Sequence, residues 1–356
     1  MESTMTHART RNGTTTVARL HRDAEAAART RQEQLTKPRG ALGRLEEIAC
    51  WFAARQGRVR PEPLRPHIVV FAADHGVCAE GVSAYPSVVT AEMVKNFVRG
   101  GAAINVLARQ CGAALDVVDV GVATDLTGLE GIVHARVRPG TANLLHEAAM
   151  TPKEYAAALE AGRAGAQAAI DGGANLLIAG EMGIGNTTAS ACLICRLAGI
   201  APEEVVGYGT GVDEAGRTRK IDVVGRALAR IRELPDDRVP AEVGGLEIAA
   251  MTGFYLAAAQ AGVPAVVDGF IAAAAALAAR LTAPSVTDWL LASHCSEERG
   301  HRAALAALGL EPLVDFGMRL GEGTGAALAV PLLQAAIALH NEMATFADAG
   351  VTDKDG

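Results

Sequence analysis

Residues 176–188 have the sequence LLIAGEMGIGNTT, and this stretch decides the fold. Its apolar start, Leu176 to Ala179, predicts a buried strand, and the glycines that follow predict a turn into a helix. Ligands bind at such strand ends in an open α/β sheet, because the free N–H groups and the dipole of the next helix favour an anion. A turn that needs glycine only for positive φ is the alternative, but it has no use for a carboxylate, an amide and two hydroxyls. We therefore predict a phosphate or carboxylate site at Gly180, Glu181, Gly183, Gly185, Asn186, Thr187 and Thr188.

Further apolar runs lie between helical stretches, at residues 67–73, 114–120, 264–267, 289–292 and 312–316. Together with residues 176–179 they predict about six strands. Because helical stretches alternate with these strands, we expect the α/β class, with a doubly wound, mainly parallel sheet covered by helices on both faces. Every strand end carries polar residues, which predicts one shared cleft at the carboxyl edge. They are Asp74-His75, Asp119, Gly180-Glu181, Asp268-Gly269, Ser293-His294 and Asp315, with residues 319–325 just beyond the last strand.

The chain is predicted to form a large domain and a small one. Residues 1–16 are polar and predict a disordered tail, and residues 17–60 contain two amphipathic helices. Residues 61–325 contain all the predicted strands and form the large catalytic α/β domain. No later segment covers the apolar face of the helix in residues 326–346, so we expect that helix to join the N-terminal helices in a small domain, before a tail at residues 347–356.

The composition argues against several classes of partner. The chain has 356 residues and a net charge of −7, and its lysines and arginines are dispersed, so it lacks the basic patch that a nucleic acid requires. No hydrophobic signal segment opens the chain, and its longest apolar run, residues 270–279, is too short to span a membrane. We expect a protein that binds a small molecule, without a nucleic-acid or membrane partner.

The six cysteines are scattered rather than arranged as a disulfide framework, which favours a reducing cytoplasm. Cys192 and Cys195 have the spacing of a redox or zinc pair. They lie inside the predicted helix after the glycine loop and have no second pair, so we interpret them as core residues.

Two more glycine-rich loops carry chemical groups. Residues 317–326 place Glu322 in a flexible glycine frame at a helix start, where it is either a catalytic base or a carboxylate that favours the helix dipole. Residues 207–213 form the other loop, and Lys220 follows it as a cation for a phosphate.

A zinc site is one hypothesis for residues 294–301, because His294, Glu297 and His301 can share one helix face. The alternative, which we favour, is a strand end followed by an exposed capping turn, with Ser296 capping and Glu298 in the first turn. For His75 we favour a role in orienting its loop over a role as a base.

These motifs together resemble the nicotinate-nucleotide–dimethylbenzimidazole phosphoribosyltransferases, the family that makes the lower ligand of cobalamin. The resemblance spans nearly the whole chain. It rests on eight motifs in order, at residues 37–46, 73–77, 80–86, 96–105, 180–190, 245–247, 268–270 and 319–325.

The resemblance implies transfer of phosphoribose from nicotinate mononucleotide to 5,6-dimethylbenzimidazole, with inversion at the anomeric carbon. It also implies a Rossmann-like large domain, a small helical domain and a homodimer. We expect no cofactor and no metal requirement, because this donor has no pyrophosphate and the sequence lacks the adjacent acidic pair of pyrophosphate-donor phosphoribosyltransferases. Glu322 matches the general base, and Glu181 is the second catalytic candidate. The nucleotide and phosphate positions are Gly180, Gly183, Gly185, Asn186, Thr187, Thr188, Gly209, Thr210, Gly211, Lys220, Asp268, Ser296, Gly323 and Thr324, and the base pocket is Ser83, Tyr85 and Leu320.

Three positions depart from the family pattern. Ala41 replaces a common serine, Ser87 a common glutamine and Tyr208 a common arginine. Because of these three differences, a second interpretation stays open: a related phosphoribosyltransferase whose acceptor is adenine, another benzimidazole or a phenol. A non-catalytic nucleotide-binding protein is the other alternative; it would keep the glycine loops but would have no need of Glu322.

Overall fold

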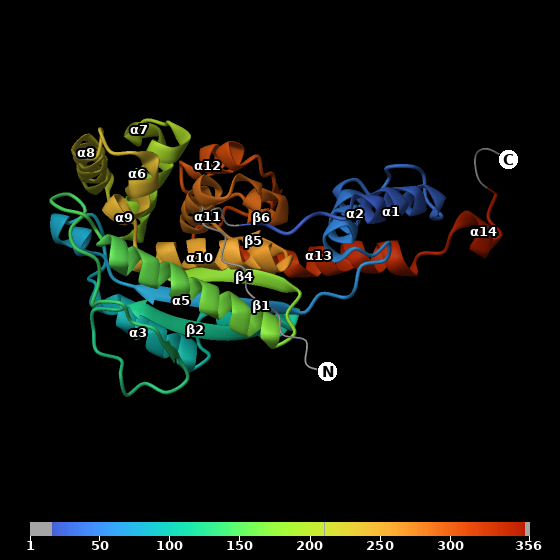
Figure 1. Ribbon diagram of the computed structural model, residues 1–356, viewed down its shortest axis with the longest axis horizontal. Helices are drawn as coiled ribbons and strands as arrows, with labels where there is room; N and C mark the ends of the chain where they lie inside the picture. Colours follow the sequence, from blue (N-terminus) through green and yellow to red (C-terminus); the bar gives the residue numbers. More distant parts are fainter. Residues whose placement is uncertain (1–15, 210, 353–356) are drawn as a thin grey trace, which may run out of the picture.

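The computed structural model describes residues 16–209 and 211–352, and a sheet of parallel strands organises them (Figure 1). The strands are β1 (Pro66–Ala73), β2 (Ala114–Gly121), β3 (Val133–His134), β4 (Leu176–Met182), β5 (Ala265–Val267), β6 (Leu290–His294) and β7 (Pro312–Val314). All neighbouring pairs are parallel, in the order β3-β2-β1-β4-β5-β6-β7. The predicted doubly wound parallel sheet is confirmed with its six strands, and β3 is an additional strand that the sequence did not predict.

The helices alternate with the strands along the chain. They are α1 (Arg22–Gln34), α2 (Arg44–Gln56), α3 (Val88–Val98), α4 (Ala103–Cys111), α5 (Pro152–Asp171), α6 (Asn186–Ala198), α7 (Pro202–Val205), α8 (Glu214–Arg230), α9 (Val239–Val243), α10 (Leu246–Ala261), α11 (Phe270–Thr282), α12 (His301–Leu308), α13 (Thr324–Glu342) and α14 (Phe346–Ala349). Short 3-10 helices lie at Gly76–Glu80, Asp236–Arg238 and Pro284–Trp289.

Two hydrophobic cores lie on opposite faces of the sheet, because successive side chains of a strand point to opposite sides. Val69 and Phe71 of β1 belong to the core with α5, α6, α10 and α11. Ile68 and Val70 belong to the core with α2, α3, α4 and α13. The helices approach closely where glycine removes a side chain: a Cβ at Gly162 of α5 would collide with the backbone of α10.

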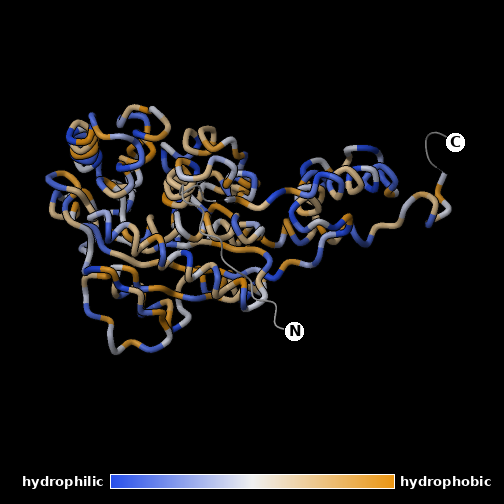
Figure 2. Tube along the Cα trace, viewed as in Figure 1, coloured by the Kyte–Doolittle hydropathy of each residue, from blue (hydrophilic) through white to orange (hydrophobic). Residues whose placement is uncertain are grey.

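Helix α1 and the segment that follows it contact the C-terminal part of α13 and the residues after it, beyond the edge of the sheet. In Figure 1, α1 and α2 lie side by side at one end of the molecule and α14 lies farther out, beyond the end of α13; Figure 2 shows many hydrophilic positions along α1. Arg31 of α1 donates a hydrogen bond to the carbonyl oxygen of His340 in α13 (3.0 Å), and Leu35 pairs with Thr345. The predicted tail at residues 1–16 lies almost entirely outside the described residues, whereas the segment predicted as the C-terminal tail begins inside α14.

Helix α13 is the one described helix that is long and apolar enough to cross a membrane, judged by length and composition. Its core residues include Ala326, Val330 and Leu333, which pack in the core shared with α2 and α4. Core helices of globular proteins have the same length and composition, and the packing of α13 accounts for its apolar character.

The strand order reverses between β1 and β4, because the chain builds β2 and β3 on one side of β1 and β4 to β7 on the other. Ligands of doubly wound folds bind at this switch point, outside the carboxyl ends of the strands. Residues 74–76 and 183–185 follow β1 and β4 there, so the fold brings two of the predicted loops together.

Candidate active site

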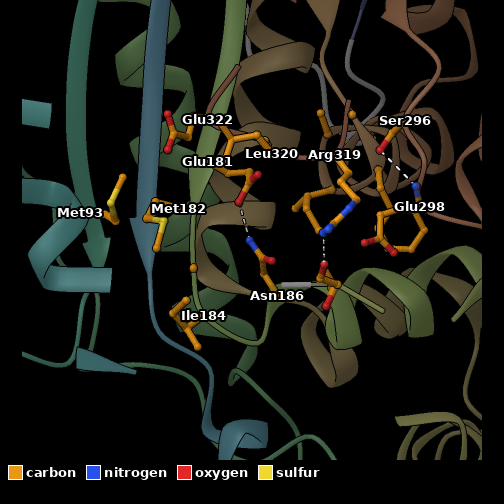
Figure 3. A pocket seen from close by; sticks show the side chains of 18 of the residues that line it. Met93, Glu181, Met182, Ile184, Asn186, Ser296, Glu298, Arg319, Leu320 and Glu322 are labelled. Carbon is orange, nitrogen blue, oxygen red and sulfur yellow. Dashed lines mark hydrogen bonds between the residues drawn. The ribbon is translucent and has the colours of Figure 1, made fainter. Parts of the chain in front are cut away.

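A cavity of about 440 Å³ opens at the carboxyl edge of the sheet (Figure 3). It is lined by residues that the sequence had assigned to the site: Tyr85, Glu181, Gly183, Asn186, Thr187, Gly209, Ser296, Leu320 and Glu322. The polar strand ends that were predicted to meet in one cleft contribute four more residues: Gly269, His294, Arg319 and Gly321. The remaining lining residues had no assigned place in the cleft: Val89, Met93, Met182, Ile184, Phe270, Ile271, Ala272 and Glu298. The predicted shared cleft therefore exists, and the part of its wall that was not predicted is mostly apolar.

Glu322 has the most unusual backbone in the cleft. Its φ of 64° makes it the only non-glycine residue with positive φ in the described chain, and it lies between Gly321 and Gly323, which also have positive φ. The side chain is buried, and its carboxylate accepts a hydrogen bond from the N–H of Ile104 (3.4 Å). Burial raises the pKa of Glu322, and nearby Asp268 adds to this rise. A strained, buried carboxylate in a cleft is typical of a functional residue.

Asp268 and Gly180 hold the turn of Glu322 from behind. The Asp268 carboxylate accepts hydrogen bonds from the N–H groups of Gly323 (3.1 Å) and Ala326 (2.8 Å), at the start of α13. A Cβ at Gly180 would collide with the carbonyl oxygen of Glu322. Asp268, Gly180, Gly323 and Thr324 do not line the cavity in the described chain, although all four were predicted to contact the nucleotide.

Glu181 is the second carboxyl group of the cleft, at the end of β4. The Asn186 side chain donates a hydrogen bond to it. Burial, with the negative charges of Glu247 and Asp268 nearby, raises the pKa of Glu181 to about 8. Glu181 therefore carries a proton at neutral pH and can donate a hydrogen bond.

The polar end of the cleft lies where α6 begins. Lys220 of α8 is not among the described residues that line the cavity; it is 1% exposed and lies behind the wall. Its Nζ donates a hydrogen bond to the hydroxyl of Thr187 (2.9 Å), with Gly209 packed beside both. Burial lowers the pKa of Lys220. One ammonium group, one hydroxyl and the start of a helix are the groups that bind a phosphate.

Several predicted phosphate residues lie outside this cavity wall. Thr188 is buried, and its hydroxyl has no partner among the described residues. Gly185 has positive φ and packs against Cys78, and Gly211 is exposed. Thr210 lies outside the described residues.

In the turn between β6 and α12, Glu297 and Arg299 are exposed, but the two residues assigned to an exposed cap, Ser296 and Glu298, are buried, so that prediction was wrong for them. Ser296 does accept a hydrogen bond from the N–H of Glu298 (3.3 Å), but both side chains are buried and α12 begins later, at His301. Gly207 packs directly against the Glu298 carboxylate. Glu298 is thus buried by the loop before α8, which is distant from it in sequence.

The metal alternative has no support in this turn. The Nδ1 atom of His301 accepts a hydrogen bond from the N–H of Ser296 (2.8 Å). In the part of the chain that the structure describes, no group of three or more His, Cys, Asp or Glu residues is arranged to hold a metal ion.

A buried ion pair lies behind the glycine loop. His75 Nε2 is 2.6 Å from the Glu247 carboxylate, and both side chains are fully buried. Burial alone would lower the pKa of His75, but Glu247 raises it above the ordinary value. A Cβ at Gly183 would lie 2.9 Å from the Glu247 carboxylate, so the pair contacts the loop directly. This arrangement fits an orienting role for His75 and adds Glu247, which the sequence had not paired with it.

The apolar end of the cleft is open. Tyr85 is 53% exposed and Leu320 is 59% exposed, and Val89, Met93 and Met182 complete this part of the wall. Ser83 does not line the cavity among the described residues; its hydroxyl accepts a hydrogen bond from the N–H of Tyr85 (3.2 Å) and shapes that turn.

Comparisons with known proteins agree with one another. A family model described as phosphoribosyltransferase matches residues 17–351. A nicotinate-nucleotide–dimethylbenzimidazole phosphoribosyltransferase from Chromobacterium violaceum is 64% identical over 337 residues, which cover 94% of this chain and 98% of that protein. The protein of the same name from Thermus thermophilus is 56% identical over 328 residues, covering 92% and 98%. A crystal structure of CobT from Thermus thermophilus superposes with a TM-score of 0.90 at 55% identity and covers 93% of this chain and 99% of that one.

Proposed function

The chain belongs to the nicotinate-nucleotide–dimethylbenzimidazole phosphoribosyltransferase family, and we propose that its cleft transfers phosphoribose from nicotinate mononucleotide to 5,6-dimethylbenzimidazole. The products are α-ribazole 5'-phosphate and nicotinate. One ring nitrogen of the benzimidazole attacks the anomeric carbon from the face opposite nicotinate and forms the new C–N bond. The old C–N bond breaks, and its electron pair neutralises the pyridinium nitrogen of the leaving nicotinate.

Glu322 takes the proton that the other benzimidazole nitrogen loses, so no cation accumulates on the product. The observation that carries this proposal is the conformation of Glu322, a buried carboxylate in a strained backbone between the polar and apolar ends of one cleft. The ring nitrogen of nicotinate becomes neutral when the C–N bond breaks, so the leaving group needs no proton from a general acid. A single general base is therefore sufficient. The raised pKa of Glu322 brings this base nearer to a neutral working pH.

Glu181 is given a different task from Glu322, because its proton is retained at neutral pH. It serves as a hydrogen-bond donor to the bound nucleotide, while Asn186 fixes its carboxyl group from the other side. Burial raises the pKa of both carboxyl groups, and the division of roles between them rests on their positions: Glu181 is bonded to Asn186 at the end of β4, and Glu322 lies in the strained turn.

The donor phosphate is assigned to the polar end, beside Lys220, Thr187, Gly209 and Ser296. The buried Lys220 donates a hydrogen bond to Thr187, and its ammonium group has further donors for phosphate oxygens. The acceptor ring is assigned to the apolar end. Ala41, Ser87 and Tyr208, which depart from the family pattern, are not among the described residues that line the cavity, and this favours dimethylbenzimidazole over adenine or a phenol.

The enzyme is further proposed to work as a homodimer, as the family resemblance implies, and in the cytoplasm, as its scattered cysteines indicate. All six cysteines are free thiols, which agrees with a reducing compartment.

The proposal is tested by incubating the enzyme with nicotinate mononucleotide and, separately, dimethylbenzimidazole, adenine, a phenol or no acceptor. Chromatography then measures nicotinate and the new riboside phosphate. We expect equal amounts of both products and the highest kcat/KM with dimethylbenzimidazole. Nicotinate release without acceptor would indicate a hydrolase, and no release would leave only nucleotide binding.

A further inference from the structure

Arg319 lies in the irregular segment that leads from β7 to Glu322. Gly317 and Gly321, both with positive φ, flank it, and neither a helix nor a strand fixes the residues between them. Its side chain lines the cleft, between Leu320 on one side and Glu298 on the other (Figure 3). In the segment that leads to Glu322, Arg319 is therefore the one charged side chain between two glycines, Gly317 and Gly321.

The Arg319 side chain connects this segment to the polar end of the cleft. Its Nη1 atom donates a hydrogen bond to the carbonyl oxygen of Gly209 (2.8 Å). Gly209 in turn packs against Lys220 and Thr187, the pair assigned to the donor phosphate. One hydrogen bond therefore joins the loop of the proposed base to the loop beside the proposed phosphate site.

Few other contacts hold this segment before Glu322. The carbonyl oxygen of Met318 accepts a hydrogen bond from the N–H of Glu297 (3.0 Å), and Asp315 pairs with the exposed Arg302 at its start. Within residues 316–321, Arg319 is the only side chain with a hydrogen bond to another part of the described chain. Asp268, Gly180 and the N–H of Ile104 hold Glu322 and the turn after it. Since glycines leave the backbone of residues 317–321 many conformations, the Arg319 bond restricts how this segment approaches Glu322 from the other side.

We propose that Arg319 is a positioning residue for the general base: its bond to Gly209 holds Glu322 at the distance from the acceptor ring that proton transfer requires. This inference rests on the proposed function and on Glu322 as the base. It also means that the position of the base depends on the loop that borders the donor phosphate. The geometry matters because a misplacement of about 1 Å costs on the order of 100-fold in rate.

A different role for Arg319 is direct binding of the donor phosphate by the rest of its guanidinium group. The two roles predict different kinetics. A positioning residue acts through Glu322 and lowers kcat only where Glu322 is present. A phosphate ligand acts on the donor and raises its KM whether or not Glu322 is present.

The test is a double-mutant cycle with Arg319→Ala and Glu322→Gln, assayed as nicotinate release in single turnovers. We expect Arg319→Ala to lower kcat by about 10- to 100-fold in the wild-type background and by less than about 3-fold in the Glu322→Gln background. The donor KM should change by less than about 3-fold in both. Equal losses of kcat in the two backgrounds, or an effect on donor KM alone, would overturn the inference.

Arg302→Ala is the matched control, because it removes an arginine that bonds the same segment from an exposed position outside the cavity. It should leave kcat within about 2-fold. Arg319 is exposed, so its alanine variant should unfold within about 2 °C of the wild type; a larger drop would make the bond a structural one and also count against the inference. Wild-type release of nicotinate is measured alongside, so failure of the proposed function is distinguished from failure of the positioning role.

Discussion

The two ends of the cleft are built in opposite ways. At the donor end, Lys220 is 1% exposed and is held by a hydrogen bond to Thr187, and both residues lie on helices. At the acceptor end, Leu320 is 59% exposed and lies on an irregular segment. A buried, fixed site binds its ligand with little ordering cost, whereas an open site must order side chains on binding.

This difference indicates where the enzyme selects its substrates. The donor end can be strict, because a ligand that lacks an expected polar group leaves buried protein groups unpaired. The acceptor end can be tolerant, since an apolar wall with two flexible methionines, Met93 and Met182, discriminates weakly between flat rings. Glu322 lies between the two ends, and the chemistry depends on both meeting there.

The largest expected effect is at that junction. Glu322→Gln keeps the shape and hydrogen-bonding capacity of the side chain but cannot accept the proton, so turnover should fall by roughly 10²–10⁴-fold with near-normal donor binding. Steady-state kinetics and donor titration measure the two quantities. Glu297→Gln, an exposed carboxylate in a neighbouring turn, is the control and should change neither. If the folded Glu322→Gln variant had near-normal turnover, another residue would have to be the base, and Glu181 would be the first candidate.

The second prediction concerns the buried carboxyl group of Glu181. The pKa of Glu181 is raised from 4.5 to about 8, so between these values the folded protein holds a proton that the unfolded chain releases. The stabilisation is complete below pH 4.5 and is lost as pH rises through 8, by on the order of a few kcal/mol. Urea unfolding between pH 5 and about 8.5 should show this loss for the wild type and a flatter profile for Glu181→Gln. Parallel profiles would show that Glu181 does not hold the proton.

The third prediction separates the two ends by their substrates. Lys220→Met keeps the buried stem but removes the charge, so the KM for nicotinate mononucleotide should rise by about 10- to 100-fold while the KM for dimethylbenzimidazole barely changes. Initial-rate measurements with each substrate varied in turn test this. A changed acceptor preference would mean that Lys220 does not belong to the donor end.

The smallest expected effect is at the open end. Leu320→Ala should raise the acceptor KM by only about 2- to 5-fold, because the side chain is more than half exposed before binding and contributes modest apolar contact. Phe316→Ala is the control: Phe316 is exposed in the same segment but does not line the cavity of the described chain. If Leu320→Ala raised the donor KM by the same factor, Leu320 would not belong to the acceptor end alone, and the proposed difference between the two ends would be wrong.

The fold was predictable where local pattern and burial agree. The run at residues 176–179 is apolar because β4 lies between two cores, and the glycines after it are required by close contacts such as that of Gly180 with the turn of Glu322. Strand β3 escaped prediction because it has two exposed residues, Val133 and His134, and no apolar run. A strand that short is defined by its pairing with β2 rather than by its own sequence.

The site was predictable where a residue's own loop places it, as with Glu322 in its glycine frame. It was not predictable where distant segments meet. Glu298 was expected to be exposed, and the loop at Gly207 covers it. Arg319 was expected at the cleft but given no partner there, because its bond to Gly209 depends on the packing of two loops that are 110 positions apart. Met93 joins the wall only because α3 packs against β1, β2 and β4, of which β4 is distant from it in sequence.

The most direct test of the account is chemical rescue of the base. Glu322→Gly suits the positive φ at this position and leaves room for a small carboxylate, so added formate should restore turnover in proportion to its concentration. The same formate should not restore Glu181→Gly, because Glu181 is assigned to hydrogen bonding rather than to proton removal. Rescue of the Glu181 variant, or no response of a folded, donor-binding Glu322→Gly enzyme, would contradict the assignment of Glu322 as the base.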